Sequence, residues 1–259
     1  ALGRLRASLG DPLFVRGPRG LEPTERALAL APVVSRALED LAGALDGTPF
    51  DPARSDRSVA LGVVDPVAAV LGPPLVARVA REAPLLSLSL RTYDGSRGLV
   101  ALEDGEIDLL VAPCPHPPAW AVVAPLYTTR WVALTRPDHP YAAAPSLERW
   151  LAARHVGTGS GWIDGRLAAR GLTRQLVVTV SSGLAVPWLV AGEALVATVP
   201  AAFAEAVAPS LGLVVTELPE LVQAPLTLAT IVSRRRADRA PVMWLVRCLR
   251  AVAPGSDPA

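Results

Sequence analysis

Several polar residues of this chain follow stretches with strand patterning and precede stretches with helix patterning. At such turns the helix dipole and the free backbone N–H groups favour an anion. Ligands of α/β sheets also bind beyond the carboxyl ends of the strands. The sequence therefore predicts a small-molecule site whose candidate residues are Asp65, Pro66, Val67, Tyr93, Asp94, Gly159, Ser160, Ser181, Ser182 and Thr198.

Two of these candidates have an equally good structural explanation. Asp65 and Ser182 both stand at the start of an expected helix, where Asp and Ser side chains commonly cap free backbone N–H groups. An ionised Asp65 facing the ligand would disfavour an anion, although capping would offset part of that effect. Both roles stay open for these two residues.

Patterns for catalysis or metal binding are missing from the sequence. It contains no nucleophile elbow, Walker loop or HExxH motif. The run from Gly157 to Gly161 resembles a dinucleotide loop but lacks a third glycine at the required spacing, so a tight turn lining a pocket fits it better. We expect no catalytic residue, no cofactor and no metal ligand.

The other polar residues that draw attention have ordinary explanations. Glu103, Asp104 and Asp108 lie at an expected helix end and strand start, so we expect them to be solvated or to act as caps. Exposed or capping positions are also expected for the three histidines, which lack metal-ligand spacing: His116, His139 and His155.

From residue 58 onward, expected strands and helices alternate in two successive units. The first unit alternates them over 58–64, 66–81, 85–92, 96–103 and 107–112. This order implies right-handed crossovers and a largely parallel sheet. The second unit runs from 146 to 218, and strand-like passages near 126–134 and 219–228 join the two. The sequence therefore predicts an α/β fold of two hinged subdomains with a cleft between them.

The N-terminal part has a different pattern. Leucines at helical spacing over 2–9 are followed by a short apolar strand over 13–16 and a basic turn, an order that fits a winged helix. Thr24 is the expected N-cap of the next helix. That helix carries a narrow heptad seam, which favours dimerisation over packing on its own domain, and the predicted contact residues are Val34, Leu38, Leu41 and Leu45.

Composition limits the class of protein. A length of 259 residues suits about two domains, and half of the residues are hydrophobic. The sequence shows neither a membrane span nor a secretory signal, so we expect a cytoplasmic protein that does not bind membranes. The net charge of +1 gives no global basic field. Cys114 and Cys248 are expected to be free thiols.

Several motifs resemble those of LysR-type transcriptional regulators and occur in that family's order. The segments 11–16 (DPLFVR) and 20–24 (GLEPT) resemble the wing, and 102–109 (LEDGEIDL) resembles a recurrent segment of the sensor domain. Residues 136–140 (RPDHP) and the run from 189 to Pro200 are also similar, although Ala194 stands where a second glycine is usual. The wing places the chain near the nodulation-regulator branch.

The resemblance implies a domain plan. Residues 1–23 would be part of a winged helix-turn-helix, and 24–56 a dimerisation helix with a hinge. Residues 57–259 would be an effector-binding domain like periplasmic binding proteins. Its subdomain I would cover about 57–128 and 226–259, and its subdomain II about 129–225. The implied partners are promoter DNA, a small organic effector and further copies of the chain in a homodimer or homotetramer.

The resemblance also implies a limit on DNA binding. In the family, the residues before Ala1 would form the first two helices and most of the recognition helix, so base reading would lie mainly outside this chain. The arginines of the segment would contact phosphates, which position a protein without specifying sequence; they are Arg4, Arg6, Arg16 and Arg19. We expect this chain to bind DNA weakly or not at all in a gel shift.

Two other classes stay open at this point. A stand-alone solute-binding protein could use the same two-lobed fold, although the wing-like residues and the missing export signal argue against it. An α/β enzyme is the weaker alternative, because no nucleophile and base are arranged for catalysis.

Overall fold

The computed structural model describes residues 1–17, 20–46, 50–159 and 161–255. Among the predicted contact residues, Arg19 and Ser160 lie outside this set, and so does the side chain of Leu45.

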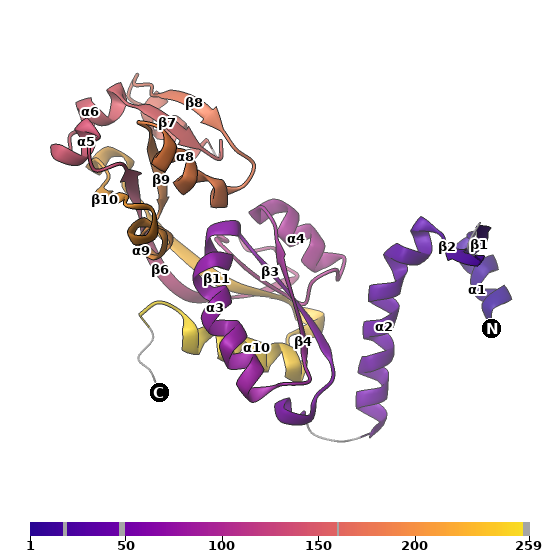
Figure 1. Ribbon diagram of the computed structural model, residues 1–259. Coiled ribbons are helices and arrows are strands. Elements are labelled where there is room, and N and C mark those ends of the chain that lie inside the picture. Colours follow the sequence, from indigo (N-terminus) through magenta and orange to yellow (C-terminus); the bar gives the residue numbers. More distant parts are fainter. Residues whose placement is uncertain (18–19, 47–49, 160, 256–259) are drawn as a thin grey trace.

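The N-terminal part consists of a helix, a hairpin and a long helix. They are α1 (Leu2–Leu9), β1 (Phe14–Gly17), β2 (Gly20–Pro23) and α2 (Glu25–Asp46). Gly10 ends α1 in the left-handed conformation, with φ at 64°. Figure 1 shows these elements standing apart from the large sheet.

Asp11 fixes the hairpin to the start of α2. Its Oδ1 accepts hydrogen bonds from the backbone N of Leu13, at 2.6 Å, and from the Thr24 hydroxyl, at 2.8 Å. The Thr24 oxygen in turn accepts a bond from the backbone N of Ala27 at 3.1 Å, which confirms the predicted N-cap.

The rest of the described chain forms one nine-stranded sheet divided into two lobes. In the first lobe β3 is parallel to β4 and to β5, and β11 runs antiparallel to β5. After the short 3-10 turn η1 (Pro52–Arg54), this lobe comprises β3 (Ser58–Val63), α3 (Asp65–Glu82), β4 (Ser87–Thr92), α4 (Gly95–Glu103), β5 (Leu109–Ala112), β11 (Pro225–Ser233), η4 (Arg234–Arg236) and α10 (Ala240–Val252).

In the second lobe β7 is parallel to β8 and to β9. Helices lie on both faces of its sheet. The elements are α5 (Pro140–Ala143), α6 (Leu147–Ala152), β7 (Arg154–Gly157), α7 (Trp162–Ala168), β8 (Gln175–Thr179), η2 (Gly183–Ala185), α8 (Val186–Gly192), β9 (Val196–Pro200), α9 (Ala201–Leu211), β10 (Val214–Glu217) and η3 (Glu220–Val222).

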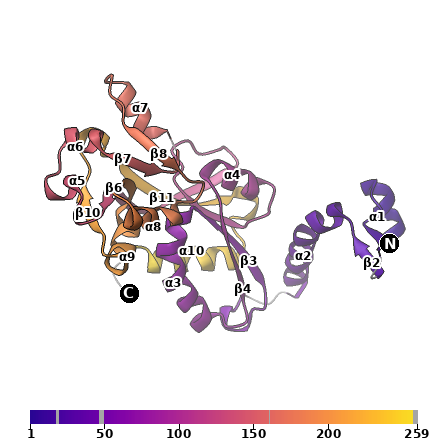
Figure 2. The same ribbon diagram turned by 45° about the horizontal axis from the view of Figure 1, so that its top comes forward.

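Strand β6 (Ala121–Thr135) belongs to both lobes. It pairs with β11 from Ala121 to Arg130 and with β9 from Trp131 onward, and β10 pairs with its last residues. Figures 1 and 2 both show β6 and β11 running from one lobe to the other. The strand is longer than the predicted 126–134, because its first residues continue the ladder with β11.

Each lobe buries apolar side chains on both faces of its part of the sheet. In the first lobe α3 and α10 cover one core and α4 covers the other, while in the second lobe α8 and α9 lie opposite α5, α6 and α7. These layers confirm the predicted α/β fold with two subdomains. None of the helices in the described part of the chain is long and apolar enough to cross a membrane.

Asp108 corrects the sequence analysis. We expected a solvated or capping carboxylate, but Asp108 is only 1% exposed. Its Oδ2 accepts a bond from the backbone N of Ala60 at 2.9 Å, and its Oδ1 accepts one from Arg239 Nη1 at 2.9 Å. Arg236 Nη1 lies 3.7 Å from the same oxygen. The carboxylate therefore ties the first strand of the lobe to the segment that leads into α10.

His155 also differs from the expectation of an exposed or capping residue. It is fully buried, its ring packs edge-on against Trp150 at 4.4 Å between centroids, and its Nε2 lies 2.7 Å from the Trp150 carbonyl oxygen. Burial lowers the pKa of His155 to about 4. His139 does act as a cap, because its Nδ1 accepts a bond from the backbone N of Tyr141.

We expect Asp108→Ala to lower the free energy of unfolding by about 3 kcal/mol, because it leaves a partly buried guanidinium and a buried N–H without this partner. Urea titration measures the change. The matched control is Asp104→Ala, at an exposed helix end, with an expected change below about 0.5 kcal/mol. Equal effects of the two substitutions would refute the structural role of Asp108.

The lowered pKa of His155 predicts a loss of stability in acid. The folded state holds the ring neutral, whereas the unfolded chain takes up a proton below the ordinary value of 6.5, so stability falls as the pH drops from there to about 4. Between pH 7 and pH 4.5 this residue should account for roughly 2 kcal/mol. The free energy of unfolding is measured against pH for the wild type and for His155→Gln, whose side chain does not titrate. The difference between the two curves isolates the contribution of His155, and parallel curves would contradict the prediction.

Candidate functional site

The parallel strands of both lobes end toward the region where β6 and β11 pass between the lobes. The turns after β3 and β4 belong to the first lobe, and the turns after β7 and β8 belong to the second. This arrangement follows from the topology, because neighbouring parallel strands end on the same edge of a sheet. The turns that carry the predicted contact residues are therefore positioned by the fold.

Helix α3 connects the two lobes because it carries two apolar faces. Val67, Leu71 and Leu75 are buried in the first-lobe core. Ala69 and Val70 pack instead against the second-lobe core that contains α8 and α9. A spacing of four residues places the first set on one side of the helix, and the adjacent Ala69 and Val70 lie on another side. The start of α3 is therefore held against both lobes.

One contact at this junction joins Pro66 to the turn at Gly183. An ideal Cβ atom built on Gly183 would lie 3.1 Å from Pro66 Cγ and 3.8 Å from Thr158 Cγ2. We call these three residues, Pro66, Thr158 and Gly183, the lobe junction. Gly183 was not among the predicted contact residues, although it directly follows the predicted Ser182.

Polar groups next to the lobe junction are partly used by the fold. The Ser182 hydroxyl accepts a bond from the backbone N of Leu184 at 3.3 Å, which confirms its predicted capping role. Asp65 does not cap α3, because Val64 holds the N-cap position and Asp65 is the first helical residue. Its carboxylate therefore sits beside the helix N-terminus, where the dipole favours negative charge. Ser181 is exposed.

Thr198 carries a hydroxyl with no use inside the described structure. Its Oγ1 is buried and has no hydrogen-bond partner among the described residues. The residue lies on β9, paired with Ala133 on β6, two residues before the strand ends. A buried hydroxyl without a partner is costly, so this atom is available to a ligand.

Gly159 supports the turn after β7. It has a left-handed φ of 69°, and a Cβ atom there would lie 3.2 Å from Thr179 Cγ2 at the end of β8. The backbone N of Val180 donates to the Gly157 oxygen at 3.0 Å. Gly157 and Gly159 thus lie where the ends of β7 and β8 come together.

Three predicted contact residues do not face the lobe junction. Val67 is buried in the first-lobe core. Asp94 caps α4 through the backbone N of Arg97 at 2.8 Å, and this bond and one from the Ser96 hydroxyl hold the pKa of Asp94 below its usual range. Tyr93 lines a separate pocket over α4. A strand end predicts where a residue lies, but it does not fix where its side chain points.

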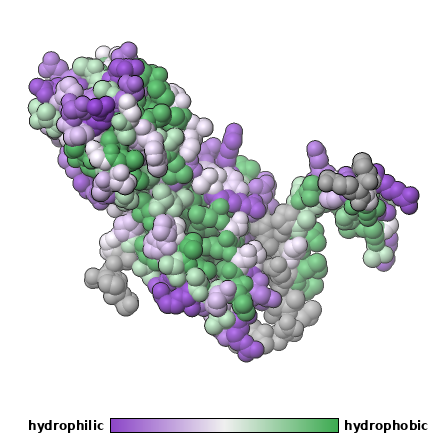
Figure 3. All heavy atoms as spheres, viewed as in Figure 1, coloured by the Kyte–Doolittle hydropathy of each residue, from purple (hydrophilic) through white to green (hydrophobic). Residues whose placement is uncertain are grey.

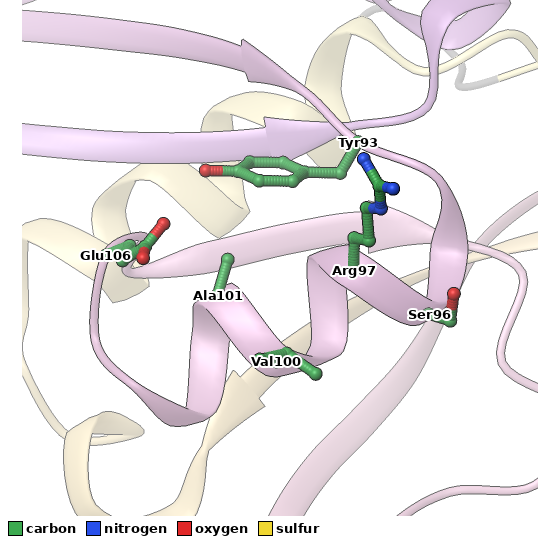
Figure 4. A pocket seen from close by; sticks show the side chains of 6 residues that line it. All are labelled: Tyr93, Ser96, Arg97, Val100, Ala101 and Glu106. Atoms are coloured by element: carbon green, nitrogen blue, oxygen red, sulfur yellow. The ribbon is translucent and has the colours of Figure 1, made fainter. Parts of the chain in front are cut away.

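The pocket at Tyr93 has a volume of about 330 Å³ and lies on the α4 side of the first lobe. In Figure 4 the tyrosine ring lies over α4 with its hydroxyl on the side of Glu106, while Arg97 rises from the helix near the tyrosine backbone. A second pocket of about 290 Å³ lies at the strands that pass between the lobes; Thr129, Trp131, Gln223 and Pro225 help to line it.

Trp131 in this second pocket was not predicted. Its ring contacts that of Trp162 at 5.3 Å between centroids, and the neighbouring Arg130 donates to Glu217 at 3.0 Å. The sequence gave no signal for this contact, because it joins side chains of two elements, β6 and α7, that are separated along the chain. In the part of the chain that the structure describes, no group of three His, Cys, Asp or Glu side chains could hold a metal ion.

The other predicted contacts lie in the N-terminal part. Arg4 and Arg16 are exposed, and Arg6 donates from Nε to the Pro12 oxygen at 2.7 Å. On α2 the described seam residues are exposed: Val34 by 49%, Leu38 by 61% and Leu41 by 56%. Apolar residues are in view along α2 in Figure 3.

The chain matches a family model described as the LysR substrate binding domain over residues 53–254. The HTH-type transcriptional activator NagR of Ralstonia sp is 35% identical over 211 residues, covering 79% of this chain and 70% of the relative. NahR of Pseudomonas putida is 36% identical over 221 residues, covering 82% and 73%. Nodulation protein D 1 of Bradyrhizobium japonicum is 31% identical, covering 85% and 70%.

Solved structures agree with these relatives. The probable transcriptional regulator PA0477 from Pseudomonas aeruginosa has a TM-score of 0.76 at 32% identity, covering all of this chain and 86% of its own. The regulatory domain of MexT from the same organism has a TM-score of 0.68 at 25% identity, covering 78% of this chain and all of its own. These regulators favour the first interpretation over a solute-binding protein or an enzyme. The chain belongs to the LysR-type family of transcriptional regulators.

Proposed function

We propose that this LysR-type regulator binds a small organic molecule beside the lobe junction and responds by changing the spacing of its lobes. The observation that carries the proposal is the Thr198 hydroxyl on the second-lobe strand β9, which is buried and has no partner among the described residues. It offers a directed polar contact of the kind that ligand sites use to fix orientation.

The predicted residues that suit such a site are the ones at the turns of both lobes. Pro66 contributes from the start of α3, Gly159 and Ser181 from the turns after β7 and β8, and Thr198 from β9. Asp65 beside them disfavours a strongly anionic ligand. The arrangement therefore suits a small organic molecule with hydrogen-bonding groups and modest charge.

Assembly through α2 completes the proposal. Helix α2 carries a row of leucine and valine side chains that are about half-exposed or more. Such a row stabilises a protein only when a partner covers it. A second copy supplies the matching seam, which makes the chain a homodimer or a pair of such dimers. The exposed Arg4 and Arg16 would then contact phosphates of promoter DNA in the cytoplasm, with no role in catalysis.

Thr198→Val tests the effector site. A thermal-shift screen of small organic acids and aromatics identifies a ligand, and the substitution should weaken its binding about 5–10-fold through the lost hydrogen bond. Stability should be unchanged or higher, because the hydroxyl is unpaired. The matched control is Thr230→Val, whose buried hydroxyl donates to the Ala124 oxygen; it should cost about 1 kcal/mol and spare binding. Full binding by Thr198→Val would overturn this site.

Assembly is tested by Leu38→Glu, which places a charge in the predicted seam. The dimer dissociation constant should rise at least about 10-fold, since burial of one leucine is worth about 1.5–3 kcal/mol. Light scattering coupled to gel filtration measures the mass. The control Ser35→Glu alters an exposed residue outside the seam and should leave the mass unchanged. A mass unaffected by Leu38→Glu would exclude α2 as the interface.

A further inference from the structure

Gly183 is glycine for reasons of space alone. Its backbone is not among those with a positive φ, so any L-residue could adopt the same conformation. The residue is nevertheless buried at the start of η2, directly after the capping Ser182. What needs an explanation is therefore the absence of a side chain at position 183.

A side chain at Gly183 would press against the other lobe. A Cβ atom on Gly183 would lie 3.1 Å from Pro66 Cγ and 3.6 Å from its Cδ. Both atoms belong to the pyrrolidine ring, which can change its pucker but cannot swing away as an open side chain can. Pro66 itself stands in the first turn of α3.

Neither side of this contact can retreat easily within its own lobe. Helix α3 is seated in the first-lobe core by Val67, Leu71 and Leu75, which are at most 3% exposed. The turn at Gly183 is fixed by the Ser182 cap and by Val186, buried in the second-lobe core. Because packed interiors resist compression, added volume at this point is relieved by moving one lobe against the other.

We propose that Gly183 is a positioning residue whose missing side chain sets how closely the two lobes approach each other. The contact with Pro66 acts as a stop between lobes that are also joined by β6 and β11 and by the packing of Ala69 and Val70 against the second-lobe core. The width of the proposed effector site then depends on this stop, and that consequence rests on the proposed function. The spacing between the lobes does not depend on the proposed function.

The test is a steric rescue in the ligand-free chain. Gly183→Val should increase the radius of gyration measured by small-angle X-ray scattering at unchanged molecular mass. Overpacking should also lower the Tm by about 5 °C. Adding Pro66→Ala to this variant removes Cγ and Cδ from the contact and should reverse at least half of the change in the radius of gyration and in the Tm. Pro66→Ala alone should not increase the Tm or decrease the radius of gyration.

Gly192→Val is the matched control. Gly192 ends α8 in the same lobe, is exposed and has no atom within 4 Å of an added Cβ, so neither readout should change much. If Gly183→Val does not fold, Gly183→Ala replaces it, since the Pro66 ring then has to yield by only a few tenths of an ångström.

Two results would overturn the proposal. One is a radius of gyration that stays the same in the Gly183 variant, which would place the strain inside one lobe. The other is a full change that Pro66→Ala does not relieve. Neither measurement needs an effector or DNA, so failure here leaves the effector site untouched, and failure of the Thr198 test leaves this contact untouched.

Discussion

Continuous hydrogen bonding along β6 is the constraint on which the arrangement of the lobes depends. Buried backbone groups have to be paired, and this 15-residue strand satisfies them with β11 in the first lobe and with β9 and β10 in the second. The lobes are therefore parts of one sheet. They can move relative to each other only by bending or twisting β6 and β11, which keeps the turns of both lobes facing each other.

The pairing of these two strands is irregular at one place. The register shifts between Leu228 and Ala229, opposite Tyr127 and Pro125. Proline has no N–H to donate to the ladder, and a bulge locally bends and twists a strand. The shift lies on the first-lobe side of the crossing. Contacts between the lobes elsewhere involve Pro66, Ala69 and Val70, whose apolar packing is non-directional and permits small displacements.

The order of strands and helices was predictable from the sequence because apolar periodicity and turn residues are local signals. The family resemblance rested on short motifs in order, and the Thr24 and Ser182 caps followed from residue type. The burial of Asp108 was not predictable, because its partner Arg239 lies 131 residues away. The burial of His155 was missed although its partner Trp150 lies only five residues before it. The direction of the Tyr93 side chain was also not predictable, since a strand end fixes the position of the backbone but leaves the ring free to lie over α4.

The bonds around Asp11 make the hairpin and the start of α2 a single rigid piece, because one carboxylate oxygen binds both Leu13 and the capping Thr24. Helix α2 has 22 residues and is therefore about 33 Å long. A helix of that length works as a lever arm, although Pro32 weakens it locally in its first half. A tilt of about 5° at its C-terminal end would carry the hairpin, and Arg16 on it, through ~3 Å, about the rise of one base-pair step.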